Sequence, residues 1–245
     1  MLAVTQNSNI PFITTDQMSE VDRTMMEDYG IDLAKMMENA GRKLAHLARS
    51  RFLGGPPKGK RGRCWQGREA TEEEGLCAPD GSTTGEQMSP CGYHRQQNDS
   101  LRFRDTSYRS WSAGAFRSTH RRRDDLSSAD LCIDALIGYS LSGPPRGATA
   151  TLIQAVNAHD APVLALDAPS GVDTTNDVAC EPVIQAAATM TLALPKEGLR
   201  SEATREFVGE LYLTDISVPP ELYAKPPLNL AIDPIFAKDD VVRIW

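Results

Sequence analysis

The sequence predicts an α/β fold built on a doubly wound, mainly parallel sheet. Short apolar runs typical of fully buried strands alternate with helical patterns through the C-terminal half. Strands and helices that alternate at this spacing favour right-handed βαβ units. A length of 245 residues suits one domain with a substantial core. We therefore expect residues 1–245 to form a single domain, with an anomalous passage at 55–129.

Two helices are predicted near the N-terminus. Thr14 and Gln17 have the spacing of a capping box, and the apolar residues that follow recur at helical spacing until Gly30. The second helix ends at Gly54-Gly55. Its apolar residues fall on one face, which predicts burial on that side: Leu33, Met36, Met37, Ala40, Leu44, Leu47 and Ala48.

Four strands are predicted after residue 129, in DLCIDALIG, PVLALD, TMTLALP and ELYLTDI. The segments ATLIQAVNAH and EPVIQAAA between them are predicted as helices. In open sheets of this kind ligands bind beyond the carboxyl ends of the strands. The loops that follow these strands are therefore where we expect the functional residues.

Composition limits the function. A net charge of −7 argues against a general nucleic-acid binder, because phosphate neutralisation needs a basic face. The N-terminus lacks a secretory pattern, and no window approaches the ~18 apolar residues of a membrane span. We expect a cytoplasmic protein without nucleic-acid or membrane partners, and a mitochondrial location stays open.

Polar residues follow two of the predicted strands. Asp134 ends one apolar run, and Asp167 ends another, with Ser170 shortly after it. An aspartate at such a position either caps the next turn or serves a ligand. Two carboxylates and a hydroxyl also make an oxygen set suited to a hard cation. The constellation favours the functional interpretation.

A glycine-bearing loop follows the first of these strands and enters a helix near Ala148. Backbone amides at a helix start suit a phosphate, and Arg146 adds a positive charge. Glycine and proline also simply make turns, so the loop alone is a weak signal.

Five segments together resemble the NAD(P)H-hydrate epimerase family, also known as the YjeF N-terminal domain. They are MMENAGRKLA, DALIGYSLSG, LALDAPSGVDTT, LALPKEGL and GELYLTDISVP, in the order of the family. The resemblance covers residues 13–54 and 130–245. It implies a three-layer α/β/α Rossmann-like domain, usually a homodimer, that interconverts the R and S epimers of hydrated NADH and NADPH.

The resemblance also implies site residues. Asp134 and Ser170 correspond to ligands of a potassium ion, and Asp167 corresponds to the substrate-binding and acid/base carboxylate. Glu38 and Asn39 match the helix motif of the family and are expected to face the site. The substrate loop corresponds to Gly138, Tyr139, Ser140, Leu141, Ser142, Gly143 and Pro144. Ser142 stands where many members carry lysine or arginine, so that charge is missing here.

The chemistry of hydrated NAD(P)H agrees with those residues. The hydroxyl of the hydrated ring is on a carbon beside the ring nitrogen. It can therefore leave with assistance from the nitrogen lone pair and return to the other face of the ring. One carboxyl group that gives and takes a proton at this hydroxyl would catalyse both directions. A non-catalytic ligand-binding or interaction module and a generic Rossmann-like nucleotide enzyme are the alternatives. The chain ends at Trp245, soon after the last family motif, so we expect the dehydratase that acts on the S epimer to be a separate partner.

The passage at 55–129 contains no valine or isoleucine and no core-forming pattern. The family requires a strand, a glycine loop, a helix and another strand here. Shifting the reading frame by one nucleotide lets RCWQGREATEEEGLCAPDG read VLAGKGGNGGGGLVCARW, a strand and a glycine loop, and lets DTSYRSWSAGAFRST read HQLPVLERRGIPVD. We predict that a stretch within residues 61–129 is translated out of frame; a polar, disordered insertion is the alternative.

A stretch translated out of frame would change how the chain as written folds. We expect it to lack two central strands and their covering helix, which leaves neighbouring strands with unpaired edges and apolar faces exposed. The same reasoning predicts poor solubility and weak or absent epimerase activity for the chain as written.

Overall fold

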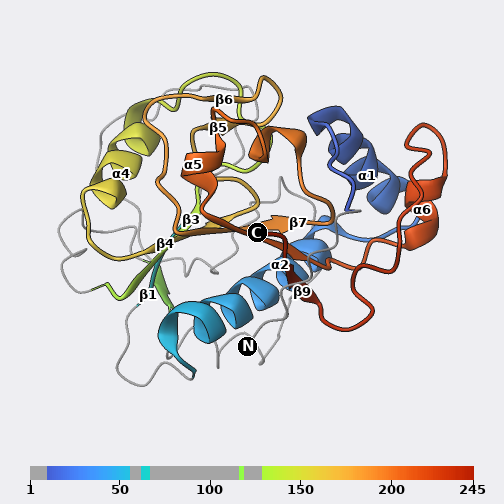
Figure 1. Cartoon of the computed structure of the whole chain (residues 1–245), viewed down its shortest axis with the longest axis horizontal. Coiled ribbons are helices and arrows are strands. Elements are labelled where there is room, and N and C mark those ends of the chain that lie inside the picture. Colours follow the sequence, from blue (N-terminus) through green and yellow to red (C-terminus); the bar gives the residue numbers. More distant parts are fainter. Residues whose placement is uncertain (1–9, 56–61, 67–115, 119–128) are drawn as a thin grey trace, which may run out of the picture.

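A seven-stranded sheet forms the centre of the molecule (Figure 1). The computed structural model describes residues 10–55, 62–66, 116–118 and 129–245. The strand order is β2-β1-β3-β4-β7-β8-β9, and all neighbours are parallel except β8 and β9. The bounds are β1 Gly62–Gln66, β2 Phe116–Ser118, β3 Leu131–Ala135, β4 Val163–Leu166, β7 Ala188–Leu192, β8 Glu210–Thr214 and β9 Val241–Arg243. A separate hairpin pairs β5 (Val172–Asp173) with β6 (Val178–Ala179).

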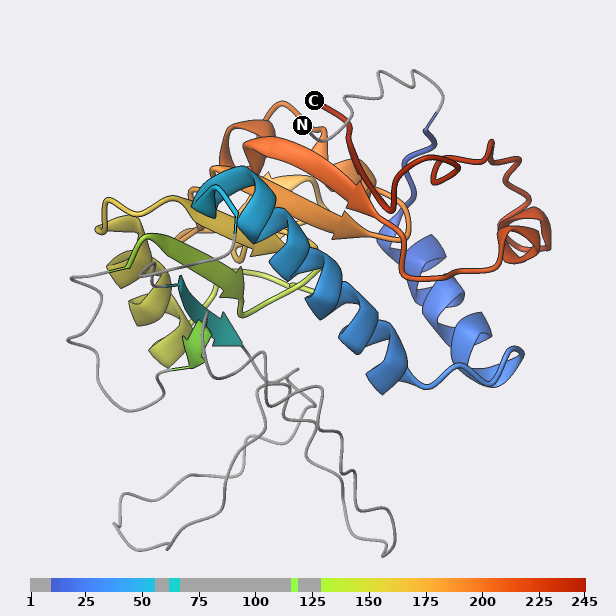
Figure 2. The same ribbon diagram turned by 90° about the horizontal axis from the view of Figure 1, so that it is seen from below.

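Helices cover both faces of the sheet, as Figures 1 and 2 show. On one face, α2 (Leu33–Leu47) continues into the π-helical turn η1 (Ala48–Leu53) and packs on β3, β4 and β7. On the other face, α4 (Gly147–Asn157) packs on β3 and β4. Because strand side chains alternate, Leu131 and Ile133 meet α2, whereas Cys132 meets α4. The predicted three-layer α/β/α fold is confirmed.

The N-terminal helices begin and end where the sequence predicts. Thr14 caps α1 (Thr15–Glu27) in a capping box with Gln17, whose backbone N–H donates to Thr14 Oγ1 over 3.1 Å. Gly54 ends η1 in the left-handed region at φ 68°, a conformation that glycine adopts without strain. Helix α1 packs beside the short helix α6 (Pro220–Ala224), at the side of the molecule away from α4 (Figure 1).

The predicted helix in EPVIQAAA is wrong. Residues 183–186 carry no helical turn, and their backbone bonds to distant segments. The N–H of Ile184 donates to the carbonyl of Ser170 over 2.8 Å, and that of Ala186 to Phe207 over 3.0 Å. Long-range backbone partners replace the local bonds that a helix would supply, and the apolar side chains are buried without helical spacing.

The expected loss of two strands from the 55–129 passage is also wrong. Strand β1 pairs with both β3 and β2, so the edge of β3 is not left open. Strands β2 and β1 form one edge of the sheet rather than its centre. Backbone pairing does not depend on side-chain identity, which explains why strands form without valine or isoleucine. Strand β2 lies inside the second of the two stretches read in the shifted frame, and β1 begins at Gly62, one residue before the first stretch. The frame itself stays a prediction.

The glycine loop and covering helix expected in that passage lie outside the described residues. The remaining short helices are η2 (Glu197–Leu199) and α5 (Arg205–Val208). Among the helices described for this chain, none has both the length and the apolar character needed to cross a bilayer.

Candidate active site

Asp134 and Ser170 meet at the carboxyl ends of β3 and β4, as the sequence predicts. The backbone N–H of Ser170 donates to Asp134 Oδ2 over 2.8 Å, and its hydroxyl donates to Oδ1 over 2.7 Å. The N–H of Leu136 donates to Oδ1 over 3.2 Å. The N–H of Ile137 in turn donates to Ser170 Oγ over 2.9 Å. Two loops that are far apart in sequence are thereby joined through one buried carboxylate.

These contacts leave Asp134 in an apolar setting with neutral partners. Its exposed fraction is 2%. Burial raises the pKa of Asp134 to about 6, although the hydrogen bonds from Ser170 and Leu136 act in the opposite direction. None of the described groups that donate a hydrogen bond to this carboxylate carries a positive charge. The carboxylate, the Ser170 hydroxyl and the nearby Ile137 carbonyl are all oxygen donors, so the chemistry of the group fits potassium.

Asp167 directly follows β4 and adopts a left-handed backbone conformation, with φ 68°. Its N–H donates to the carbonyl of Met190 on β7 over 2.8 Å, which fixes this turn to the sheet. Aspartate tolerates this region better than most residues, but the conformation is uncommon and concentrates at functional sites. The turn brings the carboxylate into a buried position between β4, β7 and the loop after β3, with an exposed fraction of 6%.

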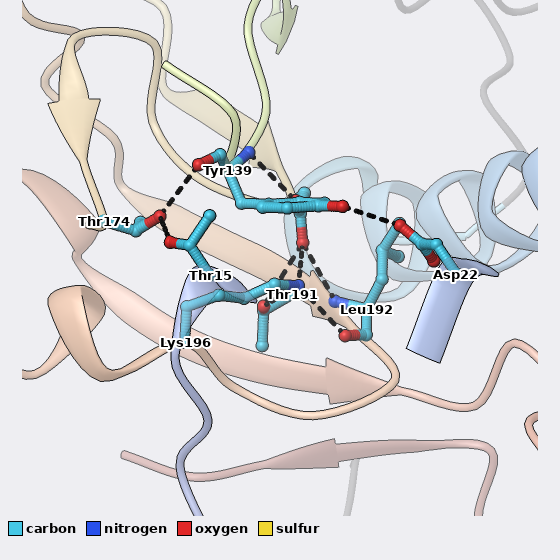
Figure 3. Close-up of polar contacts among 8 residues, drawn as sticks. Thr15, Asp22, Tyr139, Thr174, Thr191, Leu192 and Lys196 are labelled. Carbon is cyan, nitrogen blue, oxygen red and sulfur yellow. Dashed lines mark hydrogen bonds and ion pairs between the residues drawn. The ribbon is translucent and has the colours of Figure 1, made fainter. Parts of the chain in front are cut away.

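The carboxylate of Asp167 forms an ion pair with Lys196. Lys196 Nζ lies 2.5 Å from Asp167 Oδ1, and the lysine side chain is fully buried. The same ammonium donates to the carbonyl of Leu192 over 3.1 Å and to the hydroxyl of Thr191 over 3.4 Å. These groups are at the carboxyl end of β7 and in the loop that follows it (Figure 3).

Tyr139, in the expected substrate loop, is fixed on four sides. Its N–H donates to Asp167 Oδ2 over 3.2 Å, and its carbonyl accepts from the hydroxyl of Thr174 over 2.9 Å. The phenol donates to Asp22 Oδ2 of α1 over 2.7 Å, and the ring centroid lies 5.3 Å from Lys196 Nζ. Burial, together with the nearby charge of Asp22, raises the pKa of Tyr139. Figure 3 shows the ring between Lys196 and the loop backbone.

The remaining residues of the loop show where it is open to solvent. Leu141 is buried, whereas Ser140, Ser142 and Pro144 are exposed. Arg146 and the first residue of α4 are exposed as well, and no side chain caps the start of that helix. This half of the loop is therefore accessible to a ligand, as the prediction of a phosphate-binding helix start requires.

Asp173 accepts a hydrogen bond from the backbone of Gly143 in the expected substrate loop. Burial acts to raise the pKa of Asp173, but hydrogen bonds from Asn176, Thr175 and the backbone of Gly143 outweigh it and keep the pKa below its ordinary value. The N–H of Asn176 donates to Asp173 Oδ1 over 2.9 Å. Asp173 thus connects the loop after β4 to the loop after β3.

The helix residues expected to face the site have other contacts. Glu38 pairs with Arg42 in its own helix, and Asn39 Nδ2 donates to Ser217 Oγ over 3.0 Å. Among the contacts of the described residues, neither side chain is joined to Asp167 or Asp134.

Sequence reasoning missed Lys196 and Asp22. A lysine is normally exposed, and Lys196 lies in LALPKEGL, which we used only as one of the five segments that carry the family resemblance, without assigning a role to the lysine. One signal was available in the sequence. This lysine comes shortly after the carboxyl end of a buried strand, β7, and β7 pairs with β4, the strand that Asp167 follows. Asp22 gave no signal, because it lies on an amphipathic helix where acidic residues are common.

The sheet, with polar side chains gathered where β3, β4 and β7 end, defines a Rossmann-like α/β domain with a ligand site at its strand ends. Its overall fold is similar to the crystal structure of the yeast protein YNL200c, with a TM-score of 0.66 at 16% identity over 96% of this chain and all of that one. A sequence model described as YjeF-related protein N-terminus matches residues 84–198.

Two relatives are more specific. An NAD(P)H-hydrate epimerase of Dehalogenimonas lykanthroporepellens is 35% identical over 228 residues, which cover 92% of this chain and 89% of that protein. A bifunctional NAD(P)H-hydrate repair enzyme of Moorella thermoacetica is 27% identical over 89% of this chain and 42% of its own length. The chain belongs to the NAD(P)H-hydrate epimerase family.

Proposed function

We propose that this protein is an isomerase that interconverts the R and S epimers of hydrated NADH and NADPH, a repair reaction for nicotinamide nucleotides. The observation that carries the proposal is the placement of Asp167. In a member of the epimerase family, a buried carboxylate lies at a strand end, beside an accessible glycine-bearing loop. That placement is what a proton-transferring group needs beside a bound nucleotide.

The reaction requires a proton to move in both directions. The cycle begins from the protonated form of Asp167, whose carboxyl group gives its proton to the substrate hydroxyl, and the C–O bond breaks as water departs. The lone pair of the ring nitrogen forms a C=N bond at the same carbon. Water then adds to the opposite face and returns a proton to the carboxylate, so Asp167 ends in its starting state.

The test is Asp167→Asn, assayed by the rate at which one purified epimer is converted into the other. We expect the rate to fall by about 10²–10⁴-fold, the usual contribution of a general acid–base group. Asp160→Asn, at an exposed aspartate after α4, is the matched control and should keep the full rate. An Asp167→Asn protein that folds and epimerises normally would contradict the proposal. Nucleotide binding without turnover in the unmutated protein would favour a binding module instead.

We further propose that Asp134 and Ser170 hold a potassium ion beside the substrate. When bound, the ion would supply a positive charge near the oxygens of the nucleotide. The buried, neutral surroundings of Asp134 support this proposal, because a carboxylate with these partners has no countercharge of its own. Potassium chloride should raise the unfolding temperature of the unmutated protein more than sodium chloride does. Ser170→Ala should reduce that difference, and an unchanged difference would overturn this assignment.

The expected homodimer, the separate dehydratase partner and the cytoplasmic location belong to the same proposal. Pairing with a dehydratase is supported by the name of the Moorella relative, a bifunctional repair enzyme. Light scattering of the purified chain tests the dimer. A coupled assay with a dehydratase specific for the S epimer tests the pairing, since this protein should then allow the R epimer to be consumed as well.

A further inference from the structure

The two oxygens of the Asp167 carboxylate have different surroundings. Oδ1 faces Lys196 Nζ at 2.5 Å, the N–H of Leu192 at 3.4 Å and the hydroxyl of Thr191 at 3.5 Å. The hydrogen bond to Oδ2 comes from the N–H of Tyr139, over 3.2 Å. One oxygen is therefore directed toward a buried cation, and the other toward the substrate loop.

Lys196 itself is enclosed. Its side chain is fully buried, and the ammonium is held by Asp167, by the Leu192 carbonyl and against the ring of Tyr139. A cation in this position acts on a ligand through Asp167, because protein groups surround it. Burying an ion pair is also a poor way to stabilise a fold, since each ion loses several kcal/mol of hydration. Stability alone is therefore a weak reason for a lysine here.

The second oxygen lies against a residue that has no side chain. Gly138 lies against it, and a methyl group built on this glycine would be 3.3 Å from Asp167 Oδ2. The chain thus places its smallest residue beside the oxygen that faces the loop. Among the contacts described for Asp167, Oδ2 is the oxygen on the side of the substrate loop, whereas Oδ1 is on the side of Lys196.

We propose that Lys196 is a positioning residue for the epimerase reaction, which holds Oδ1 of Asp167 and leaves Oδ2 as the atom that transfers the proton. The proposal rests on the function proposed above. As the proton moves from Oδ2 to the departing hydroxyl, the carboxyl group becomes negatively charged, and the electron pair of the breaking C–O bond leaves with the water. The Lys196 ammonium stabilises that developing charge from the opposite oxygen, as a buried and preorganised cation.

The first experiment compares Lys196→Met with the unmutated protein. We expect kcat to fall by about 10²–10³-fold, the effect of removing one preorganised charge-stabilising donor. KM should change by less than about threefold, because the lysine acts in the transition state rather than in binding. Lys225→Met is the matched control: Lys225 also stacks on a tyrosine, with Nζ 5.0 Å from the ring centroid of Tyr29, but on the surface. It should leave kcat unchanged.

A double-mutant cycle tests whether Lys196 works through Asp167. If it does, Asp167→Asn combined with Lys196→Met should be no slower than Asp167→Asn alone. A further tenfold loss in the double variant would overturn the proposal. So would a Lys196→Met protein with normal kcat when Asp167→Asn is inactive, which would leave the epimerase function itself intact. Normal turnover by Asp167→Asn would instead refute the epimerase mechanism.

Lys196→Gln covers the case in which the methionine variant does not fold. Its amide retains a hydrogen-bond donor for Oδ1 but carries no charge. We expect kcat to fall nearly as far as in Lys196→Met, with a cooperative unfolding transition. A glutamine variant that is folded and keeps kcat within about threefold of the unmutated value would show that the charge is unnecessary and would overturn the proposal.

Discussion

Asp134 and Asp167 both lie near the carboxyl ends of neighbouring strands, yet their surroundings differ in charge. Asp134 ends the buried part of β3 and meets neutral donors from Ser170 and Leu136. Asp167 follows β4 and meets the ammonium of Lys196. Both side chains are almost fully buried, so exposure does not distinguish them.

The comparison shows that a position at a strand end determines where a polar side chain lies, whereas the charge of its neighbours determines which chemistry that side chain suits. The negative charge of a buried carboxylate is not neutralised by uncharged hydrogen-bond donors, so such a carboxylate is suited to bind a cation. A carboxylate whose one oxygen is already paired with a cation has its other oxygen available for proton transfer. The roles proposed for the two aspartates, a cation ligand and a proton-transfer group, differ for this reason.

The largest expected effect is on stability. Asp167→Asn leaves the buried ammonium of Lys196 without its counterion and should lower the free energy of unfolding by about 3 kcal/mol. Asp134→Asn leaves no buried ion unpaired, but its amide nitrogen faces a backbone N–H in place of an acceptor, so the change should cost only about 1–2 kcal/mol at pH 7 without potassium. Urea unfolding of the two variants at equal ionic strength measures both values.

Lys196→Met in the Asp167→Asn background sharpens this comparison. Removing the orphaned ammonium should recover part of the lost stability, since the charge that was left unpaired is gone. Equal losses for the two aspartate variants would mean that the ion pair does not distinguish the two sites.

A smaller effect is expected at Gly138. Gly138→Ala places a methyl group against Asp167 Oδ2 and should reduce kcat/KM by about tenfold, because the proton-transfer contact is displaced by a few tenths of an ångström. Gly41→Ala in α2 is the control, since a methyl group there meets nothing within 4 Å. The control should keep full activity and gain stability of about 0.5–1 kcal/mol. Equal activity in the two variants would argue against Oδ2 as the reacting atom.

The smallest effect concerns Asp173 and depends on pH. Its folded pKa lies below the ordinary value, so its contribution to stability is complete above about pH 4 and is lost as the pH falls through the folded pKa. Asp173→Asn should therefore cost about 1 kcal/mol at pH 7 and less at pH 3. Chemical unfolding at the two pH values gives the comparison, and a penalty that does not shrink in acid would contradict it.

Much of the fold was predictable because periodicity and capping are local signals. The Thr14 box, the apolar face of α2 and four strands after residue 129 are all confirmed. The segment after Glu181 was mistaken for a helix because its backbone partners are distant. Strand β9 was missed because three residues at the end of the chain carry little pattern, and its pairing with β8 is also long-range.

The site was predictable in part. Asp134, Asp167 and Ser170 could be found because strand ends in such sheets are where ligands bind, and the structure brings Asp134 together with Ser170. Lys196 could not be assigned a role, because the sequence does not reveal that its ammonium is buried against the ring of Tyr139. The reading frame of residues 61–129 is settled by sequencing the transcript across codons 55–130.

The four-sided attachment of Tyr139 has a consequence for the timing of turnover. Moving the Tyr139 ring away from Lys196 would also take the phenol from Asp22 and the N–H from Asp167. Under the proposed mechanism, a displacement of this loop for product release would therefore also release one oxygen of the proton-transferring carboxylate.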